Sequence, residues 1–308
     1  MTPSASTHRS VLALPPDMSQ EYSFCIRFSG ITIRFIAPTA LNLPECITEL
    51  LCCNCEVADA EYRITLLESP LSFENAPVYT DGNSHIYETN QGRLRVYFPL
   101  TEEDGCQVAC LFTPERKNTL YYPAKRWNHY RKYWHCAHLL WGEMLLMHLD
   151  AFLLHSSVVL KDNKAVLFCG ESGAGKSTQA DLWKTFANAE IINGDRCVIR
   201  NQNGVFFGGG SLWSGTSGIY SPLSAPIAGI ITLKKGENNS IRKLEAEAFP
   251  ALFSQITLNL WDEEFMHNVT GNLLLMLQSV PVWELTCDKS REAVSLAYKT
   301  IFSKELPL

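Results

Sequence analysis

The stretch FCGESGAGKSTQADLW, residues 168–183, contains the spacing G-x-x-x-x-G-K-S from Gly170 to Ser177. It follows the apolar run KAVLFC, which reads as a strand, and from Lys176 onward the residues favour a helix. Glycines within the loop allow positive φ angles, so several backbone N–H groups can turn toward one concavity. Because the start of a helix also attracts anions, the pattern predicts a phosphate-binding loop between a strand and a helix.

The loop pattern assigns a role to each of its polar groups. Lys176 is predicted to reach the β- and γ-phosphates of a nucleotide, and the Ser177 hydroxyl to bind Mg²⁺. The residues predicted to bind the nucleotide are Gly170, Glu171, Ser172, Gly173, Ala174, Gly175, Lys176, Ser177 and Thr178.

Two residues outside the loop are candidates for the chemistry. Asp195 closes the short apolar strand EIINGD, where a second metal-binding carboxylate or an acid/base group is expected; the alternative is an ordinary turn aspartate. His155 ends a strand upstream of the loop. On chemistry alone, a histidine at such a position is more often structural than catalytic.

Composition limits the kind of partner. The chain has 308 residues, of which 46% are hydrophobic and 19% charged, with a formal net charge of -6, as in an ordinary globular protein. It lacks a Lys/Arg-rich run, and the basic pairs at 125–126 and 131–132 are interpreted as a solvated helix edge, so no nucleic-acid partner is expected. It also lacks the roughly 18 consecutive apolar residues of a membrane span, so no membrane association is expected.

Three regions are predicted along the chain. Residues 1–19 have the composition of a disordered leader, 20–124 are β-rich, and 125–308 form a nucleotide-binding domain in which strands and helices alternate. The eleven cysteines are odd in number and scattered, and no signal peptide precedes them, which indicates reduced thiols and a cytoplasmic location.

Several elements are predicted from local patterns. Aromatic and apolar residues recur every three or four positions over 125–149, which predicts one helix, and helices are also expected over 245–258, over 263–278 and after Asp288. Asn203-Gly204 predicts a hairpin turn. The Gly- and Ser-rich segment 207–226 predicts a loop, and its part 208–218 is either a mobile segment on the acceptor side or a disordered linker.

Together, the loop, His155 and the pair Asp195-Arg196 resemble the HPr kinase/phosphorylase family, which is related to phosphoenolpyruvate carboxykinase. The resemblance covers roughly residues 150–234. The organisation of the whole chain is similar to that of stand-alone members of the family, some of which phosphorylate precursor peptides. It implies an α/β P-loop kinase core preceded by the β-rich region, with ATP and Mg²⁺ as cofactors. It also implies that Lys176, Asp195 and His155 act in catalysis, with Ser177 and Asp195 at the metal.

The resemblance implies phosphoryl transfer to a hydroxyl, typically a serine of a peptide or protein. Gly194-Asp195 stands where the family has two adjacent aspartates, and the segment 214–218 lacks the family's Arg-Gly pair, so HPr itself is not the expected acceptor. A small hydroxyl metabolite is an alternative acceptor, and a nucleotide-binding accessory protein without transferase activity is the alternative function. Association into a homo-oligomer is left open.

Overall fold

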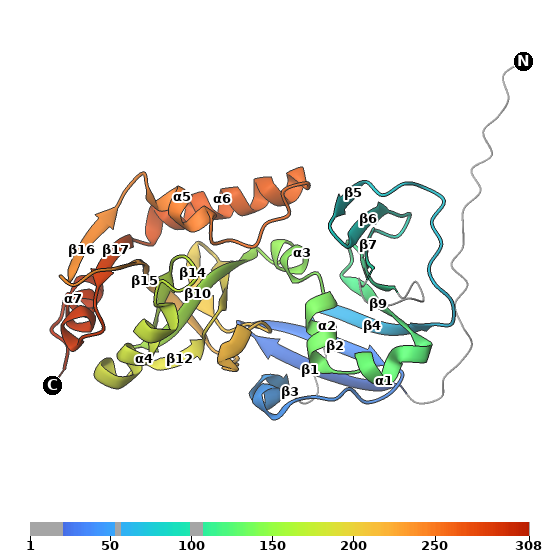
Figure 1. Ribbon diagram of the computed structural model, residues 1–308, viewed down its shortest axis with the longest axis horizontal. Helices are drawn as coiled ribbons and strands as arrows, with labels where there is room; N and C mark the ends of the chain where they lie inside the picture. The colour runs from blue at the N-terminus through green and yellow to red at the C-terminus, as the bar shows by residue number, and fades with distance from the viewer. Residues whose placement is uncertain (1–20, 53–56, 99–106, 308) are drawn as a thin grey trace, which may run out of the picture.

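The computed structural model describes residues 21–52, 57–98 and 107–307. The chain is a mixed α/β protein with two β-sheets, and helices lie between the sheets and beside the second one (Figure 1). The predicted leader, residues 1–19, falls outside the described residues. In the described part of the chain, no helix has the length and apolar character needed to cross a membrane.

The first sheet accounts for the β-rich region predicted over 20–124. It runs in the order β3-β1-β2-β4-β9-β8-β7-β6-β5, and the 3-10 helix η1 (Glu45–Leu50) precedes β3. Its strands are β1 (Tyr22–Phe28), β2 (Ile31–Ala37), β3 (Leu51–Cys52), β4 (Ala60–Leu67), β5 (Tyr79–Asp81), β6 (Ser84–Glu88), β7 (Arg93–Tyr97), β8 (Val108–Phe112) and β9 (Lys117–Pro123). In β4, Ala60, Tyr62 and Ile64 are buried at every second position, so one face of the strand packs into the core.

The second sheet holds the candidate site. Its order is β11-β10-β13-β14-β15-β17-β16, and β12 pairs with β10. Its strands are β10 (Ala151–Lys161), β11 (Lys164–Cys169), β12 (Glu190–Asn193), β13 (Arg196–Gln202), β14 (Val205–Gly209), β15 (Ser224–Lys235), β16 (Ser240–Leu244) and β17 (Val282–Cys287). Because β11 also pairs in parallel with β15, the five strands from β11 to β15 along this order close into a ring. The hairpin at Asn203-Gly204 is confirmed by the antiparallel pairing of β13 with β14.

The α-helices contribute buried apolar side chains to the core. The helices are η2 (Ala124–Arg126), α1 (Trp127–Tyr130), α2 (Tyr133–Leu139), α3 (Gly142–Met147), α4 (Lys176–Ala187), η3 (Gly215–Ser217), α5 (Ala248–Phe253), α6 (Glu263–Ser279) and α7 (Arg291–Phe302). In α4, Trp183 is fully buried, and its ring contacts Phe168 of β11 and Tyr298 of α7. The predicted helices over 263–278 and after Asp288 are confirmed, and the Asp262 carboxylate caps α6 by accepting from the Phe265 N–H.

The single helix predicted over 125–149 is wrong. Lys132 is extended and Trp141 is left-handed, so the segment forms three short helices instead of one. The break at Lys132 has a tertiary cause: Asn42 accepts from the Tyr133 N–H at 3.1 Å and donates its own N–H to the Arg131 carbonyl at 2.8 Å. A contact from a distant segment therefore overrides a regular local pattern.

Two other boundaries also differ from the prediction. The loop predicted over 207–226 is shorter, since β14 extends to Gly209 and β15 begins at Ser224. The glycines suit this strand because its surroundings leave no room for side chains: a Cβ on Gly209 would lie 2.2 Å from Ser29 Oγ. The helix predicted over 245–258 is limited to α5.

The two sheets share one hydrophobic core. A single cluster of buried side chains runs from Ile26 in the first sheet, through α2 and α3, to Val282 in the second. Polar contacts reinforce the junction: Ser29 Oγ donates to the Gly210 carbonyl at 2.7 Å, and the Tyr62 hydroxyl donates to the Leu140 carbonyl at 2.8 Å. In Figure 1, α3 lies between the two sheets, and α2 is drawn over the strands of the first sheet. The domain boundary near residue 125 stays a prediction.

The cysteines only partly match the prediction of reduced thiols. Cys25 in β1 is disulfide-bonded, which corrects the prediction at this residue. The described cysteines that are free are Cys46, Cys52, Cys110, Cys136, Cys169, Cys197 and Cys287. Several of these free thiols are buried, and burial raises the pKa of Cys110 to about 12, so that side chain stays a neutral thiol.

Candidate functional site

The loop from Gly170 to Gly175 connects the end of β11 to the start of α4, as the sequence predicts. Gly170 has φ 141° and Gly175 has φ 107°, a conformation that residues with a Cβ rarely adopt. The Ala174 N–H donates to the Glu171 carbonyl at 3.0 Å and closes a tight turn. Because the first N–H groups of an α-helix have no intrahelical acceptor, the start of α4 offers hydrogen-bond donors to an anion.

Lys176 lies beneath this loop. Only 9% of the residue is exposed, and its Nζ donates to the carbonyls of Gly170 at 2.8 Å and Glu171 at 3.2 Å. Burial lowers the pKa of Lys176, while Asp195 is among the groups that act in the opposite direction. The ammonium is thus held at the base of the loop by two neutral carbonyls, and a nearby anion would favour its charged form.

The loop opens into a cavity of about 650 Å³, which we call the loop cavity. The predicted residues that line it are His155, Ser172, Gly173, Gly175, Lys176, Ser177, Thr178 and Asp195. Gly170, Glu171 and Ala174, also predicted to bind the nucleotide, are not among its lining residues. The fold therefore gathers the loop, the candidate carboxylate and the candidate histidine around one space. The predicted strand end at His155 is wrong, because β10 continues from Ala151 to Lys161 and His155 lies within it.

His155 and Asp195 form a pair in this cavity. His155 Nε2 lies 3.2 Å from Asp195 Oδ1, and the Ser156 N–H donates to the Asp195 carbonyl at 2.9 Å. Burial and, next, the charge of Lys176 lower the pKa of His155, and the Asp195 carboxylate only partly offsets this. The imidazole is thus predominantly neutral at pH 7, and the contact is a hydrogen bond from Nε2–H to the carboxylate.

Asn193 fixes the backbone at Asp195, and the sequence analysis did not single it out. Its side chain is fully buried, and Oδ1 accepts from the N–H groups of both Asp195 and Arg196 at 2.9 Å. Asn193 also donates to Ser211 Oγ at 3.2 Å. The signal was present in the Asn193-Gly194-Asp195 turn, because an asparagine two residues before a turn residue commonly bonds that residue's backbone.

The far wall of the loop cavity comes from the segment after β14. Ser214, Thr216, Ser217 and Ile219 line it. The first three fall in the predicted segment 208–218, and Ile219 was not predicted. This wall touches the carboxylate closely: a Cβ on Gly215 would lie 2.8 Å from Asp195 Cγ. The predicted acceptor-side segment 208–218 therefore contacts the candidate carboxylate, although its first residues belong to β14.

The residues predicted to hold Mg²⁺ fit that ion in chemical type. Ser177 and Asp195 line the same cavity and offer a hydroxyl and a carboxylate oxygen, the kind of ligand that Mg²⁺ prefers while it keeps several waters. Among the described residues there is no group of three or more His, Cys, Asp or Glu side chains arranged to hold a metal. Magnesium bound to a nucleotide needs few protein ligands, so the donor set suffices.

Comparison with known proteins gives no sequence match and a weak structural likeness. No family model matches the chain, and no curated protein matches its sequence. Among solved structures, the chain is similar to the Hpr(Ser) kinase/phosphatase from Coxiella burnetii, at 12% identity and a TM-score of 0.29. That match covers 49% of this chain and 97% of the other. A likeness this weak carries no argument about the site.

Proposed function

We propose that the protein is an ATP- and Mg²⁺-dependent kinase with a P-loop core, and that it transfers phosphate to a serine of a peptide or protein other than HPr. The observation that carries the proposal is the loop cavity itself. There the glycine-rich loop and Lys176 meet the pair formed by Asp195 and His155. Neither the phosphate-binding loop nor the carboxylate–imidazole pair alone indicates phosphate transfer. Together, phosphate-binding donors that face a carboxylate and an imidazole supply what phosphoryl transfer requires.

The loop and α4 bind the triphosphate. Backbone N–H groups between residues 171 and 177 bind the β- and γ-phosphates, and Lys176 leaves its two carbonyl partners to neutralise charge that builds on them. Ser177 and Asp195 would hold Mg²⁺, which would shield the phosphate charges from the incoming hydroxyl. Thr216, Ser217 and Ile219 line the opposite wall of this cavity.

The reaction forms a bond between the acceptor oxygen and the γ-phosphorus and breaks the bond from that phosphorus to the oxygen of ADP. The proton of the acceptor hydroxyl passes to the hydrogen-bonded pair of Asp195 and His155. Since the lowered pKa leaves the imidazole neutral, His155 can take up positive charge as the proton arrives. Asn193 keeps the carboxylate in place through the backbone N–H of Asp195.

The experiment that tests this function uses γ-labelled ATP, Mg²⁺ and size-fractionated lysate of the source organism as the acceptor. Wild type is compared with Lys176→Ala and with Lys184→Ala, which changes an exposed lysine of the same helix. Label is expected in a peptide or protein fraction, present with Lys184→Ala and absent with Lys176→Ala.

Other outcomes separate the alternatives. Label in a small-molecule fraction would make the protein a metabolite kinase. Tight nucleotide binding without label in any fraction would refute transfer and support the non-catalytic accessory function. A repeat with labelled GTP determines the nucleotide preference.

A further inference from the structure

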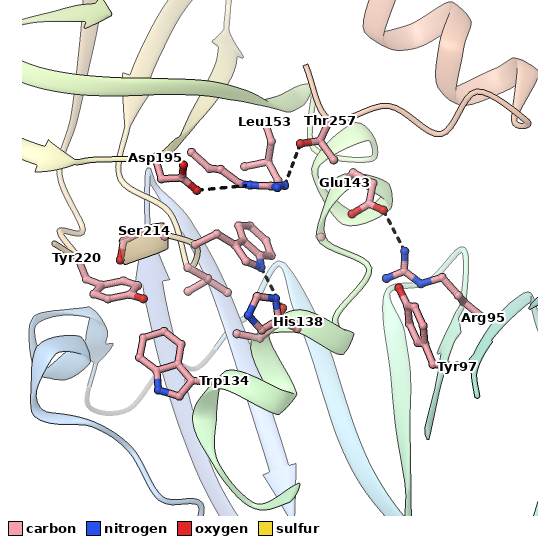
Figure 2. Close-up of a pocket in the computed structure, with 16 residues that line it drawn as sticks. Arg95, Tyr97, Trp134, His138, Glu143, Leu153, Asp195, Ser214, Tyr220 and Thr257 are labelled. Carbon is pink, nitrogen blue, oxygen red and sulfur yellow. Dashed lines mark hydrogen bonds and ion pairs between the residues drawn. The ribbon is translucent and has the colours of Figure 1, made fainter. Parts of the chain in front are cut away.

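A second cavity, of about 340 Å³, adjoins the loop cavity, and we call it the junction cavity. The two cavities share Asp195 and Ser214 in their walls. Figure 2 shows Asp195 and Ser214 on one side of the junction cavity and Arg95 and Tyr97 on the other. The candidate carboxylate is therefore accessible from two sides, one facing the phosphate loop and one facing the junction of the two sheets.

The first sheet supplies one wall of the junction cavity. Arg95 and Tyr97 project from β7, and Arg95 is only 8% exposed. The Arg95 guanidinium donates to Glu143 Oε1 of α3 at 3.0 Å and lies 4.7 Å from the centre of the Trp141 ring. These contacts join the first sheet to α3 and to Trp141, which precedes it. The cavity therefore depends on the β-rich region, whose role the sequence alone does not indicate.

The opposite wall is aromatic. Trp134, Trp213 and Tyr220 line it, and the Trp213 Nε1–H donates to the Ala137 carbonyl at 3.0 Å, which fixes that ring. Trp134 is 38% exposed, although most large aromatic side chains of the described chain are buried. A tryptophan left partly open at a cavity beside a reactive site provides a flat surface for a ligand.

The charges of the junction cavity are matched within it. Arg95 lies beside Glu143 at 3.0 Å, and Arg196 Nε lies 3.7 Å from Asp195 Oδ2. Burial lowers the pKa of His138, so this lining histidine is mainly neutral at pH 7. Every arginine that lines the cavity therefore has a carboxylate neighbour, and a negatively charged ligand would have to compete with that carboxylate.

We propose that the junction cavity is the acceptor pocket of the proposed kinase, and that it takes a hydroxyl group carried on a flat, mostly apolar and uncharged body. The inference rests on the proposed function, because it presents the hydroxyl to Asp195 from the side opposite the phosphate loop. There the acceptor oxygen bonds to the γ-phosphorus, ADP leaves and the hydroxyl proton goes to the Asp195–His155 pair. The volume suits one small molecule or one side chain, near the lower limit of about 300 Å³ for ligand sites.

Two sources share this ligand chemistry: a free aromatic alcohol, and a serine next to an aromatic residue in a peptide. The probes are 3-phenyl-1,2-propanediol, which is neutral, and 3-phenyllactate, which has a similar body but a carboxylate. The dipeptide N-acetyl-Ser-Phe-amide represents the peptide source. Binding of each to the full chain is measured by calorimetry without nucleotide, and each is then offered as an acceptor with labelled ATP and Mg²⁺.

The variants are Trp134→Ala and a matched control, Tyr22→Ala, which removes a similarly exposed aromatic side chain (37%) that lines neither cavity. The diol is expected to bind wild type and the control alike, about tenfold more weakly to Trp134→Ala, and at least about tenfold more tightly than phenyllactate does. KM for the labelled neutral acceptor should rise about tenfold in Trp134→Ala, with ATP affinity unchanged. Label in the diol or in the dipeptide identifies the source.

Two results would overturn the acceptor pocket while leaving the proposed kinase intact: transfer unaffected by Trp134→Ala, or phenyllactate bound as tightly as the diol. Failure of the proposed function is recognised separately, because wild type would then not bind ATP or would not label any acceptor. In that case the acceptor role falls with it, even if the diol binds at Trp134.

Discussion

Gly215→Ala tests whether the position of Asp195 governs phosphate transfer. Gly215 has φ 57°, and a Cβ built there would lie 2.8 Å from Asp195 Cγ and 2.9 Å from Oδ2. Since ordinary contacts of a Cβ begin at 3.4 Å, the carboxylate group must move by about 0.6 Å. That shift is directed away from the loop segment and disturbs the 3.2 Å contact with His155.

The expected effect on turnover is much larger than the effect on stability. Placing alanine in the left-handed region costs about 1 kcal/mol, which for a chain of this size lowers Tm by about 2 °C. Misplacement of a reacting group by about 1 Å can reduce the rate about a hundredfold, so a smaller shift should reduce kcat roughly tenfold or more. The assay is steady-state transfer of labelled phosphate, with thermal unfolding measured on the same preparations.

Gly218→Ala is the matched control in the same segment. Gly218 has φ 64°, but a Cβ there meets no atom within 4 Å. The variant should therefore show the same decrease in Tm and retain most of the turnover. Equal losses of turnover in the two variants, or full turnover in Gly215→Ala, would refute the reasoning that links the contact at Asp195 to catalysis.

Two more predictions concern ionisable groups. Asp195→Asn should abolish Mg²⁺-dependent transfer and keep much of the ATP affinity, as calorimetry at several Mg²⁺ concentrations can measure; an unchanged rate would make Asp195 structural. Stability should fall as pH drops from 7.5 to 5.5, because burial lowers the pKa of four histidines below 6.5 and the unfolded chain then binds more protons than the folded one. The histidines are His135, His138, His148 and His155. Urea midpoints that stay constant over this range would contradict the prediction.

The parts of the fold that are specified locally could be predicted from sequence. The strand, loop and helix around Gly170 form where expected because their apolar run and glycine spacing lie in one short segment. The same holds for α6, whose capping residue Asp262 and apolar stripe are adjacent in the sequence. The hairpin at Asn203-Gly204 follows from two residues that accept positive φ.

The parts that depend on distant contacts could not be predicted. No residue near Lys132 in the sequence indicates that Asn42 will form backbone hydrogen bonds beside it and end the helix. Likewise, Ser214 lines both cavities only because the segment after β14 folds against Asp195. Arg95 lines the junction cavity only because the first sheet packs on α3. Such placements arise from tertiary packing, which leaves no periodic signal in the sequence.

The most direct test of the central claim is calorimetric titration of the full chain with ATP in the presence of Mg²⁺. Wild type and Lys184→Ala should bind one ATP with the same affinity, and Lys176→Ala should bind at least about tenfold more weakly, because it loses charge-assisted contacts to the phosphates. Equal affinity in all three proteins, or no heat of binding with wild type, would contradict the assignment of the loop to ATP.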